Sequence, residues 1–368
     1  MSKVLVGLSG GVDSAVCAAR LLDAGENVEA FFMRLEAPTR PWSQTPQSQP
    51  QHDAQTVADF LKIPLHVWDL SREFNELVLD PFLETYRRGL TPNPCVRCNR
   101  LVKFGAVVTR ARNAGFDYVA TGHYAIRRDC EPPYCDLRRG ADITKDQSYV
   151  LAGVKPELLR SALFPLGDVA SKAETRAEAE RRGLPVAHKR DSFDICFIPD
   201  GDTRGFLCRN LGATPGDIID ENHHVVGSHN GAFQYTIGQR RGLHIPRPHP
   251  DGQPRYVTST DPETATVYVG PRRTLEVREI DVAALNWMAD PALVGVAPGL
   301  ETSIDGKPFV AQFRAHGTPL ACAAIDFRAN DTATIHLTVP TCAVAPGQSL
   351  VIYRDERVML QGTICATR

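Results

Sequence analysis

Three cysteines stand where a thiol can do chemistry. Cys95 and Cys98 form a Cys-x-x-Cys pair in a stretch that two nearby prolines stiffen. Arg97 and Arg100 flank Cys98. A positive neighbour lowers the pKa of a thiol, so we expect this pair to ionise readily. The third thiol, Cys196, follows a Lys-Arg pair. One interpretation is therefore that one thiol of the pair is a nucleophile and a neighbouring group assists it.

Two other interpretations of these cysteines are open. The pair can form half of a zinc site, with Cys130 and Cys135 as the other half. That segment reads as an exposed hairpin tip, and its spacing is unusual for structural zinc. Alternatively, the pair is inert. Cys196 lies in an apolar, strand-like run, which taken alone indicates a buried core thiol.

A glycine-rich turn near the start of the chain can bind phosphate. Val4–Leu8 is typical of a buried parallel strand, and the sequence Ser-Gly-Gly-Val-Asp-Ser over 9–14 then opens a helix. Free amides and the helix dipole at such a turn attract an anion. The helix start carries no lysine, unlike the usual P-loop. Hydroxyls at Ser9 and Ser14 can hold pyrophosphate, and Asp13 can take Mg²⁺. This pattern favours attack at the α-phosphorus of ATP with release of pyrophosphate.

Alternating strands and helices position these groups. We expect strands at 28–33, 65–69 and 118–121, and helices at 53–61 and 73–88. Such alternation predicts a parallel sheet, whose carboxyl edge brings the loop at Gly122 to the nucleotide. Residues 37–52 are rich in Pro, Gln and Ser, and we expect them to form a mobile lid. His123 is more readily a hydrogen-bonded structural histidine than a base.

The pattern of predicted secondary structure changes past Gly201. Short strands and Gly-rich links extend to about Gly270, and alternating runs beyond Glu276 predict an all-β barrel. We expect an α/β N-terminal domain with a Rossmann-like parallel sheet over 1–203, a small β-rich central domain over 204–275 and a C-terminal β-barrel over 276–368.

Composition excludes several classes of protein. With 368 residues, 43% of them hydrophobic, the chain can form two or three domains. It has no apolar run that can span a membrane, and its start does not resemble a signal peptide. Ten cysteines in such a chain indicate a reducing compartment, so we expect a cytoplasmic protein with no membrane partner. The net charge of −2 excludes a globally basic nucleic-acid binder, so RNA would need a local basic face.

Some segments are locally basic. Residues 138–149 mix cations, an amide and an aromatic, as contact with an RNA backbone and bases requires, although a solvated loop is the simpler interpretation. For the basic turn with Arg240 and Arg241, contact with RNA and a structural role are equally favoured. A capping box at 171–174 begins a helix that extends to Arg182, and its mixed charges indicate a solvated face.

Six segments in one order resemble the tRNA-specific 2-thiouridylases, the sulfurtransferases that thiolate the wobble uridine. They are 9–14, Asn93–Asn99, Thr121–Tyr124, Lys145–Tyr149, Asp194–Ile198 and Tyr235–Leu243. The resemblance covers nearly the whole chain. It implies a member of the PP-loop ATP-pyrophosphatase superfamily that uses ATP and Mg²⁺ to adenylate the uracil 2-oxygen and then transfers sulfur from a cysteine persulfide. It also implies two partners, the anticodon stem-loop of tRNA and an upstream persulfide donor such as a cysteine desulfurase or relay protein. We expect a monomer.

The resemblance also assigns roles to residues. Cys98 matches the nucleophile and Cys196 the persulfide carrier. The matches to the ATP site are Gly7, Leu8, Ser9, Gly10, Gly11, Val12, Asp13, Ser14, Met33 and Gly122. The matches to positions that contact the target base or the tRNA are Asn93, Pro94, Cys95, Lys145, Asp146, Gln147, Arg314 and Ala315. A core role is equally favoured for Met33. Ala315 replaces an aromatic common in the family, so a stacking contact is missing there.

One position departs from the family pattern. Many relatives carry an Asp, a candidate general base, where this chain has Cys95. Cys95, Cys98 and Cys196 could then converge, and three thiolates with an open fourth position suit a labile [4Fe–4S] cluster. The persulfide route is preferred, with the cluster as its alternative.

Two more remote function classes stay open. One is another PP-loop enzyme, such as an amidating synthetase or a tRNA lysidine synthetase, which has no need of Cys98 and Cys196. The other is a non-catalytic RNA-binding or iron–sulfur redox protein, which would not release pyrophosphate from ATP when tRNA is present.

Overall fold

The computed structural model describes residues 1–35, 48–190, 195–198, 200–245, 252–294, 303–304, 307–328 and 330–368. The N-terminal strands are β1 (Lys3–Gly7), β2 (Asn27–Arg34), β3 (Leu65–Asp69), β4 (Tyr118–Ala120), β5 (Ala125–Arg128), β6 (Asp136–Arg139) and β7 (Ala162–Leu163). The N-terminal helices are α1 (Val12–Asp23), α2 (Ser48–Leu61), α3 (Ser71–Phe74), α4 (Asp80–Arg87), α5 (Pro94–Cys98), α6 (Val107–Asn113), α7 (Ser148–Leu151), α8 (Pro156–Leu159) and α9 (Lys172–Arg181). Between them lie the π-helical segments η2 (Asn75–Leu79) and η3 (Asn99–Ala106) and the 3₁₀ turn η4 (Ile143–Lys145).

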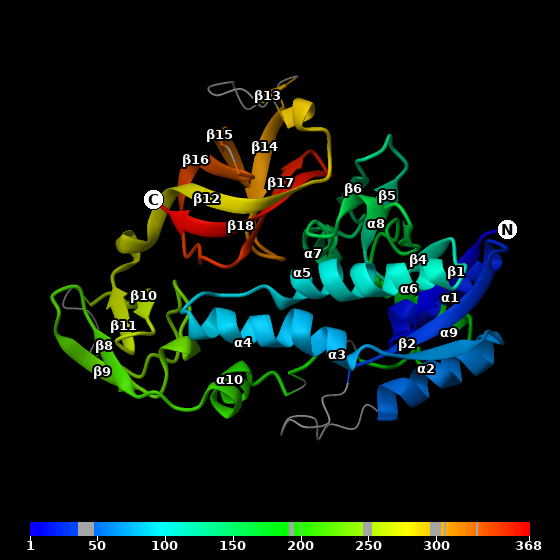
Figure 1. Ribbon diagram of the computed structural model, residues 1–368, viewed down its shortest axis with the longest axis horizontal. Coiled ribbons are helices and arrows are strands. Elements are labelled where there is room, and N and C mark those ends of the chain that lie inside the picture. The colour runs from blue at the N-terminus through cyan, green and yellow to red at the C-terminus, as the bar shows by residue number, and fades with distance from the viewer. Residues whose placement is uncertain are drawn as a thin grey trace.

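The N-terminal domain is a parallel sheet covered on both faces (Figure 1). Its strand order is β3-β2-β1-β4-β7, and every pairing in it is parallel. Val4 and Val6 on β1 pack with α1, α2 and α9, whereas Leu5 faces the opposite cluster with α4, η3 and α6. The chain reverses its direction of travel across the sheet between β1 and β4. Ligands of open α/β sheets bind at such a switch point.

Two helical rods cover the second face of this sheet and lie side by side (Figure 1). One runs through α3, η2 and α4, and the other through α5, η3 and α6. Each contains a π-helical segment, in which hydrogen bonds join residues five apart rather than four. Arg97 on α5 donates through Nε to the carbonyl of Leu77 in η2, which ties the rods together at the π-helical turn.

The central domain is a small, mostly antiparallel sheet in the order β10-β11-β8-β9. Its elements are α10 (Thr203–Leu211), β8 (Gly216–Ile219), β9 (Val225–His229), η5 (Ala232–Gln234), β10 (Tyr256–Asp261), β11 (Thr266–Gly270) and η6 (Arg272–Leu275). Ile218, Val257 and Val267 form its core and are fully buried.

The C-terminal domain is a closed antiparallel barrel. Its elements are β12 (Glu276–Trp287), η7 (Pro291–Val294), β13 (Ser303–Ile304), β14 (Lys307–Gln312), β15 (Leu320–Arg328), β16 (Thr332–Cys342), β17 (Ser349–Arg354) and β18 (Arg357–Thr367). The order β12-β16-β15-β14-β17-β18 closes because β18 pairs back to β12, which leaves no free edge in the ring. The hairpin of β5 and β6 extends from β18 through the pair Arg138 and Arg357, so the barrel is joined to the N-terminal domain.

The predicted fold class is confirmed: a parallel α/β domain, a β-rich central domain and an all-β barrel. Three local expectations need correction. The helix predicted at 53–61 begins at Ser48, so it takes in the end of the predicted lid, whose residues 37–47 lie outside the described residues. The helix predicted at 73–88 is interrupted by η2. Cys196 lies in a turn, not in a strand-like run, because its neighbour Phe197 folds back onto the helical rods.

Candidate active site

The glycine-rich turn closes on itself through hydroxyl groups. The Ser9 amide donates to Ser14 Oγ at 3.2 Å, and that hydroxyl donates to the Gly11 carbonyl at 3.0 Å. The two serine hydroxyls lie 3.3 Å apart. Gly10 has φ +72°, a left-handed conformation that favours glycine. Gly7 ends β1 immediately before the turn. The loop therefore has its compact shape before any ligand arrives.

Asp13 is the charged centre of this loop. It lies in the first turn of α1, and its Oδ1 accepts hydrogen bonds from Tyr124 Oη at 2.8 Å and from Lys172 Nζ at 2.5 Å. A Cβ on Gly122 would lie 2.9 Å from the backbone carbon of Asp13, so the loop after β4 can approach α1 this closely only with glycine at that position. The predicted contact of Gly122 with adenosine stays a prediction, and the packing against α1 is a separate reason for the glycine.

Two lysines reach this loop from far along the chain, and the sequence analysis missed both. Lys172, the first residue of α9, contacts Asp13. Lys189 donates through Nζ to the Gly10 carbonyl at 2.9 Å and to Asp53 Oδ2 at 2.5 Å. The motif itself lacks a lysine, so the protein supplies ammonium groups from outside it. The capping box placed Lys172 in the first turn of a helix, but no local signal places that turn beside the loop.

An ion-pair network clamps α9 against α1. Arg20 on α1 donates to both carboxylate oxygens of Glu178 at 2.7–3.2 Å, and Arg182 donates to Glu178 at 3.0 Å and to Asp23 at 2.6 Å. Burial alone would raise the pKa of Glu178, but its bonds to Arg20 and Arg182 lower it overall. The mixed charges of this helix are therefore not simply a solvated face. They fix the register that sets Lys172 beside Asp13.

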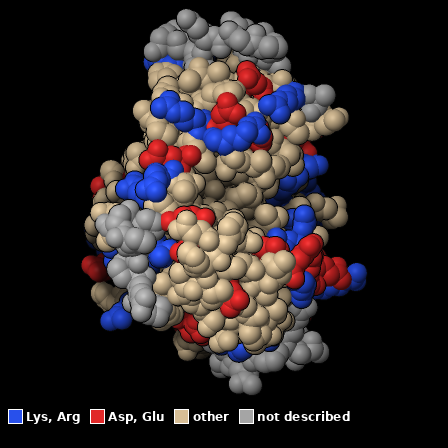
Figure 2. All heavy atoms as spheres, turned by 90° about the vertical axis from the view of Figure 1, so that its left-hand side faces the viewer, with Lys and Arg blue, Asp and Glu red and all other residues tan. Residues whose placement is uncertain are grey.

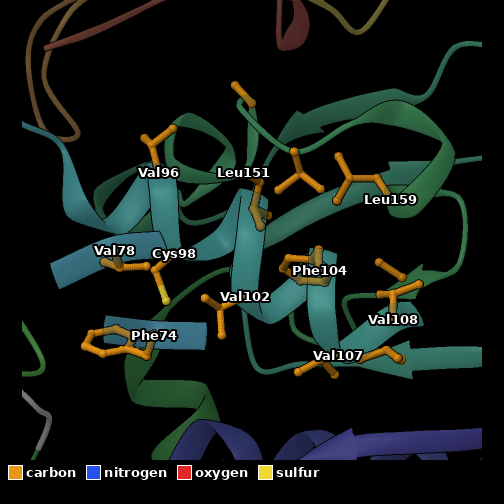
Figure 3. Close-up of a cluster of buried hydrophobic side chains, with 14 of the residues drawn as sticks. Phe74, Val78, Val96, Cys98, Val102, Phe104, Val107, Val108, Leu151 and Leu159 are labelled. Carbon is orange, nitrogen blue, oxygen red and sulfur yellow. The ribbon is translucent and has the colours of Figure 1, made fainter. Parts of the chain in front are cut away.

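Cys98 is buried inside the helical rods. Asn93 caps α5, because its Oδ1 accepts from the Val96 amide at 3.1 Å. In Figure 3 the sulfur of Cys98 points towards Phe74 and Val102, away from Val96. Burial is the main cause that raises the pKa of Cys98 to about 12. The expectation that flanking arginines make this thiol ionise readily is therefore wrong for this conformation. The apolar surroundings outweigh them.

The Cys196 segment packs on the same rods. The ring of Phe197 meets Phe74 edge-on with centroids 5.5 Å apart and Phe82 at 5.2 Å. Phe74 belongs to the cluster that encloses Cys98, so these rings bring the two cysteine segments together. Both thiols are free. After burial and Lys103, the charge of Cys196 is the next influence on the Cys98 pKa, and it raises that pKa further.

The charge of Lys103 acts on the pKa of both thiols. Although Cys196 is exposed as a residue, the protein atoms around its sulfur desolvate the thiolate and raise its pKa, while Lys103 acts to lower it. Lys103 lowers the pKa of Cys98 in the same way. Cys98 and Lys103 are five residues apart, the spacing that the π-helical hydrogen bond of η3 joins, so a turn of this kind brings them near one face.

The metal-site alternatives find no donor set in the described part of the chain. Among those residues, no group of three or more His, Cys, Asp or Glu is placed to hold a metal ion. Cys95, Cys98 and Cys196 do not form such a group in the described structure, so the cluster alternative has no support there. The segment with Cys130 and Cys135 is the tip of the β5–β6 hairpin, as predicted, and its residues Glu131–Pro133 are exposed. Cys135 itself is buried, whereas Cys130 is half-buried.

His123 is a buried neutral side chain. Its Nδ1 lies 2.7 Å from Thr121 Oγ1, and its ring packs near Phe104 and Phe164. Burial, with a smaller effect from Lys103, lowers its pKa well below the usual 6.5. The hydrogen bond and the rings fit the structural interpretation better than that of a base.

Known proteins match this chain along its length. Three family descriptions match in succession: "tRNA methyl transferase HUP domain" at 2–200, "tRNA methyl transferase PRC-barrel domain" at 204–271 and "Aminomethyltransferase beta-barrel domain" at 277–364. A tRNA-specific 2-thiouridylase MnmA of Acidothermus cellulolyticus is 46% identical over 100% of this chain and 98% of its own length. Another, of Kineococcus radiotolerans, is 47% identical over 99% of each chain. The chain belongs to the tRNA-specific 2-thiouridylase family.

A solved 4-thiouridine synthetase in complex with RNA and ATP aligns less well. It covers 54% of this chain and 45% of its own, with 19% identity and a TM-score of 0.34, an agreement too low to support a conclusion. None of the described helices of this family member is long and apolar enough to cross a membrane.

In this family member, the segment matched to tRNA contact is only partly exposed. Lys145 is exposed. Asp146 is buried, where it pairs with Arg139 at 3.1 Å and accepts from the Ser148 hydroxyl at 2.8 Å. Gln147 Oε1 accepts from the Tyr124 amide at 3.0 Å. The last two side chains therefore hold the segment in place here, and tRNA contact through them stays a prediction.

The barrel contributes the other predicted contacts. Arg314 is exposed and donates to the Ala343 carbonyl at 2.7 Å, while Ala315 is half-buried. Figure 2 shows that basic and acidic side chains are intermixed on the face of the central and C-terminal domains, with neutral residues over much of it. Any affinity of this face for RNA therefore depends on local contacts rather than on a broad positive field.

The barrel also touches the segment before Cys95. The Thr91 amide donates to the Pro346 carbonyl at 2.9 Å, and Gln348 Nε2 donates to the Pro92 carbonyl at 3.2 Å. Tyr149 Oη donates to the Ser349 carbonyl at 2.8 Å. The stretch that carries Cys95 and Cys98 is thus held between the N-terminal domain and the barrel. The sequence carries no local signal for this arrangement, because it depends on contacts between distant residues.

Proposed function

We propose that this chain uses ATP to replace the 2-oxygen of the tRNA wobble uridine with sulfur. Family membership supports this reaction. The observation that carries the proposal is the packing of Phe197 on Phe74, which sets the Cys196 segment against the helical rod that encloses Cys98. Two thiols from distant segments at one place are what sulfur transfer requires, and the other PP-loop reactions considered above have no use for them.

The first half of the reaction is adenylation. The uracil 2-oxygen attacks the α-phosphorus of ATP, the bond to the β-phosphate oxygen breaks, and pyrophosphate leaves. The turn at the start of α1 stabilises its charge, and the Ser9 and Ser14 hydroxyls exchange their bonds within the loop for bonds to phosphate oxygens. Mg²⁺ is commonly held by one or two carboxylates together with substrate phosphates. Asp13 is suited to be such a carboxylate, and the ion would supply charge neutralisation of the phosphates.

The second half is sulfur transfer. The terminal sulfur of a Cys196 persulfide attacks the activated carbon, and AMP leaves with the former 2-oxygen. Cys98 then attacks the Cys196 sulfur, which breaks the sulfur–sulfur bond and leaves 2-thiouridine and a Cys98–Cys196 disulfide. The two electrons that reduce the sulfur come from the two cysteines. An external thiol reductant then reduces the Cys98–Cys196 disulfide to two free thiols. The persulfide comes from a donor protein of the desulfurase or relay class.

The resting conformation must open for this half. With a pKa of about 12, Cys98 is a protonated thiol at neutral pH. A thiol must lose its proton to attack a disulfide-type bond. We infer that binding of the anticodon stem-loop moves the Cys196 segment and the α5 turn so that Cys98 leaves its apolar surroundings and approaches Lys103 more closely.

Nucleoside mass spectrometry of tRNA tests this function. The purified protein is incubated with unmodified tRNA, ATP, Mg²⁺ and a persulfide source, and pyrophosphate is measured in parallel. We expect 2-thiouridine at the wobble position, dependent on ATP, with pyrophosphate released. A tRNA with cytidine at that position is the matched control and should gain no sulfur. Pyrophosphate release without any thiolated nucleoside would point to another PP-loop reaction and overturn the proposal.

A further inference from the structure

The loop at 9–14 has no lysine of its own, yet two ammonium groups lie on it. Lys172 and Lys189 both come from the segment that follows the sheet, and neither belongs to the motif that defines the loop. A triphosphate concentrates negative charge on its β- and γ-phosphates. In the P-loop a lysine at the helix start meets this charge.

Each ammonium group is held by a carboxylate in the structure. Lys172 is 13% exposed and bonds to Asp13, whereas Lys189 is 37% exposed and bonds to Asp53. The Gly10 carbonyl also accepts from Lys189, which places that ammonium directly over the loop. If a metal ion and phosphates occupy the loop, Asp13 has a stronger partner than Lys172, and the lysine can turn to a phosphate oxygen.

Other cations nearby are committed elsewhere. Arg20 and Arg182 are bonded to Glu178, and Arg182 also to Asp23. Arg176 on α9 donates to the Lys189 carbonyl at 2.9 Å. The same helix therefore carries one lysine and holds the backbone of the other. This arrangement positions two cations at the phosphates while the arginines keep α9 in register.

We propose that Lys172 and Lys189 bind the β- and γ-phosphates of ATP and then the departing pyrophosphate. The inference rests on the proposed function in that it takes ATP as the ligand. In the P-loop one lysine at the helix start contacts the β- and γ-phosphates. Here two lysines outside the motif would make that contact. Exchange of carboxylate for phosphate as partner also means that each ammonium group stays paired before and after ATP binds.

Calorimetry with ATP, AMP and inorganic pyrophosphate, each with Mg²⁺, tests this assignment. Lys172→Met and Lys189→Met should each weaken ATP and pyrophosphate binding by about 10- to 100-fold, the usual effect of losing a charged hydrogen bond. AMP affinity should be unchanged, because AMP lacks the phosphates that the lysines contact. Arg181→Met is the matched control, since Arg181 is an exposed cation of the same helix, and it should leave all three affinities unchanged.

The comparison of ligands separates the possible failures. A variant that binds AMP as the wild type does is folded at the nucleotide site, and Lys172→Arg should recover part of the ATP affinity because it keeps the charge. If both Met variants keep the wild-type ratio of ATP to AMP affinity, the assignment is wrong while ATP use stands. If the wild type itself binds ATP no better than AMP, both the assignment and the proposed use of ATP fail.

Discussion

The glycine-rich loop at 9–14, here called the phosphate loop, and the two thiols Cys98 and Cys196 lie in the same domain but are built in opposite ways. The loop is closed by its own serines, and its charges are already paired on the helices α1 and α9. Cys98, by contrast, is enclosed by Phe74 and Val102, and burial holds it as a protonated thiol. In the proposed reaction, the residues of the adenylation half are therefore already arranged in the resting protein, whereas those of the sulfur-transfer half need a conformational change. Substitutions should therefore separate the two halves.

The largest separation is expected from the persulfide carrier. Cys196→Ser removes the only sulfur that can carry the persulfide in this scheme, so thiolation should fall by at least about 10³-fold. ATP affinity should not change, because the phosphate loop makes no use of this residue. Thiolated nucleoside is measured by mass spectrometry and ATP binding by calorimetry. Cys208→Ser, a change of a half-buried thiol on α10, is the control. An active Cys196→Ser protein would refute the persulfide route.

Burial of Cys98 should appear as resistance to alkylation. A pKa of about 12 in place of 9.0 lowers the thiolate fraction about 10³-fold at mildly alkaline pH. Because the pKa is raised, reactivity should keep increasing with pH beyond the range where an ordinary thiol levels off. Peptide mapping after brief alkylation should find Cys95 labelled and Cys98 spared. Bound tRNA and ATP should then increase labelling of Cys98 but not of the buried control Cys135. Rapid labelling of Cys98 without tRNA would contradict a closed resting site.

A substitution at Asp13 should impair the adenylation half of the reaction. Asp13→Ala removes a carboxylate from the phosphate loop and leaves Lys172 without this partner, so pyrophosphate release should slow by about 10²-fold or more. Alkylation of Cys98 should stay as in the wild type. Release is measured with a coupled phosphate assay. Asp59→Ala, a change of an exposed carboxylate on α2, is the matched control. A near wild-type rate in the Asp13 variant would end the adenylation account.

The smallest effect is expected at the aromatic contact between the thiol segments. Phe197→Ala removes edge-on contacts with Phe74 and Phe82, each worth about 0.5–1.5 kcal/mol. Thiolation should fall by about tenfold because Cys196 is held less well, with pyrophosphate release unchanged. Single-turnover rates measure both. Phe60→Ala, an exposed phenylalanine of α2, serves as control. An equal loss in both half-reactions would show that Phe197 supports the whole domain instead.

Sequence reasoning succeeded where the signal is local. The strand, turn and helix around Ser9–Ser14 follow from residue order alone, and alternating strands and helices led to the parallel sheet. It failed where a contact depends on how two distant helices pack against each other. Lys172 meets Asp13 only because Arg20 and Glu178 lock two distant helices together.

The thiol site shows the same limit. The arginines beside Cys98 suggested an acidic thiol, but α5 turns that sulfur into an apolar cluster formed by both helical rods. The π-helical turns were also missed, since apolar spacing does not separate hydrogen bonds to the fifth residue from those to the fourth. Hydrophobic pattern predicts that a face is buried, not which group it buries.

One measurement tests the central claim most directly. Protein loaded with persulfide on Cys196 is mixed with ATP, Mg²⁺ and tRNA for a single turnover without reductant, and three products are counted in the same sample. The account predicts pyrophosphate, 2-thiouridine and a Cys98–Cys196 disulfide in equal amounts, with the disulfide located by peptide mapping. Thiolated tRNA formed in full yield with both thiols still free would contradict it.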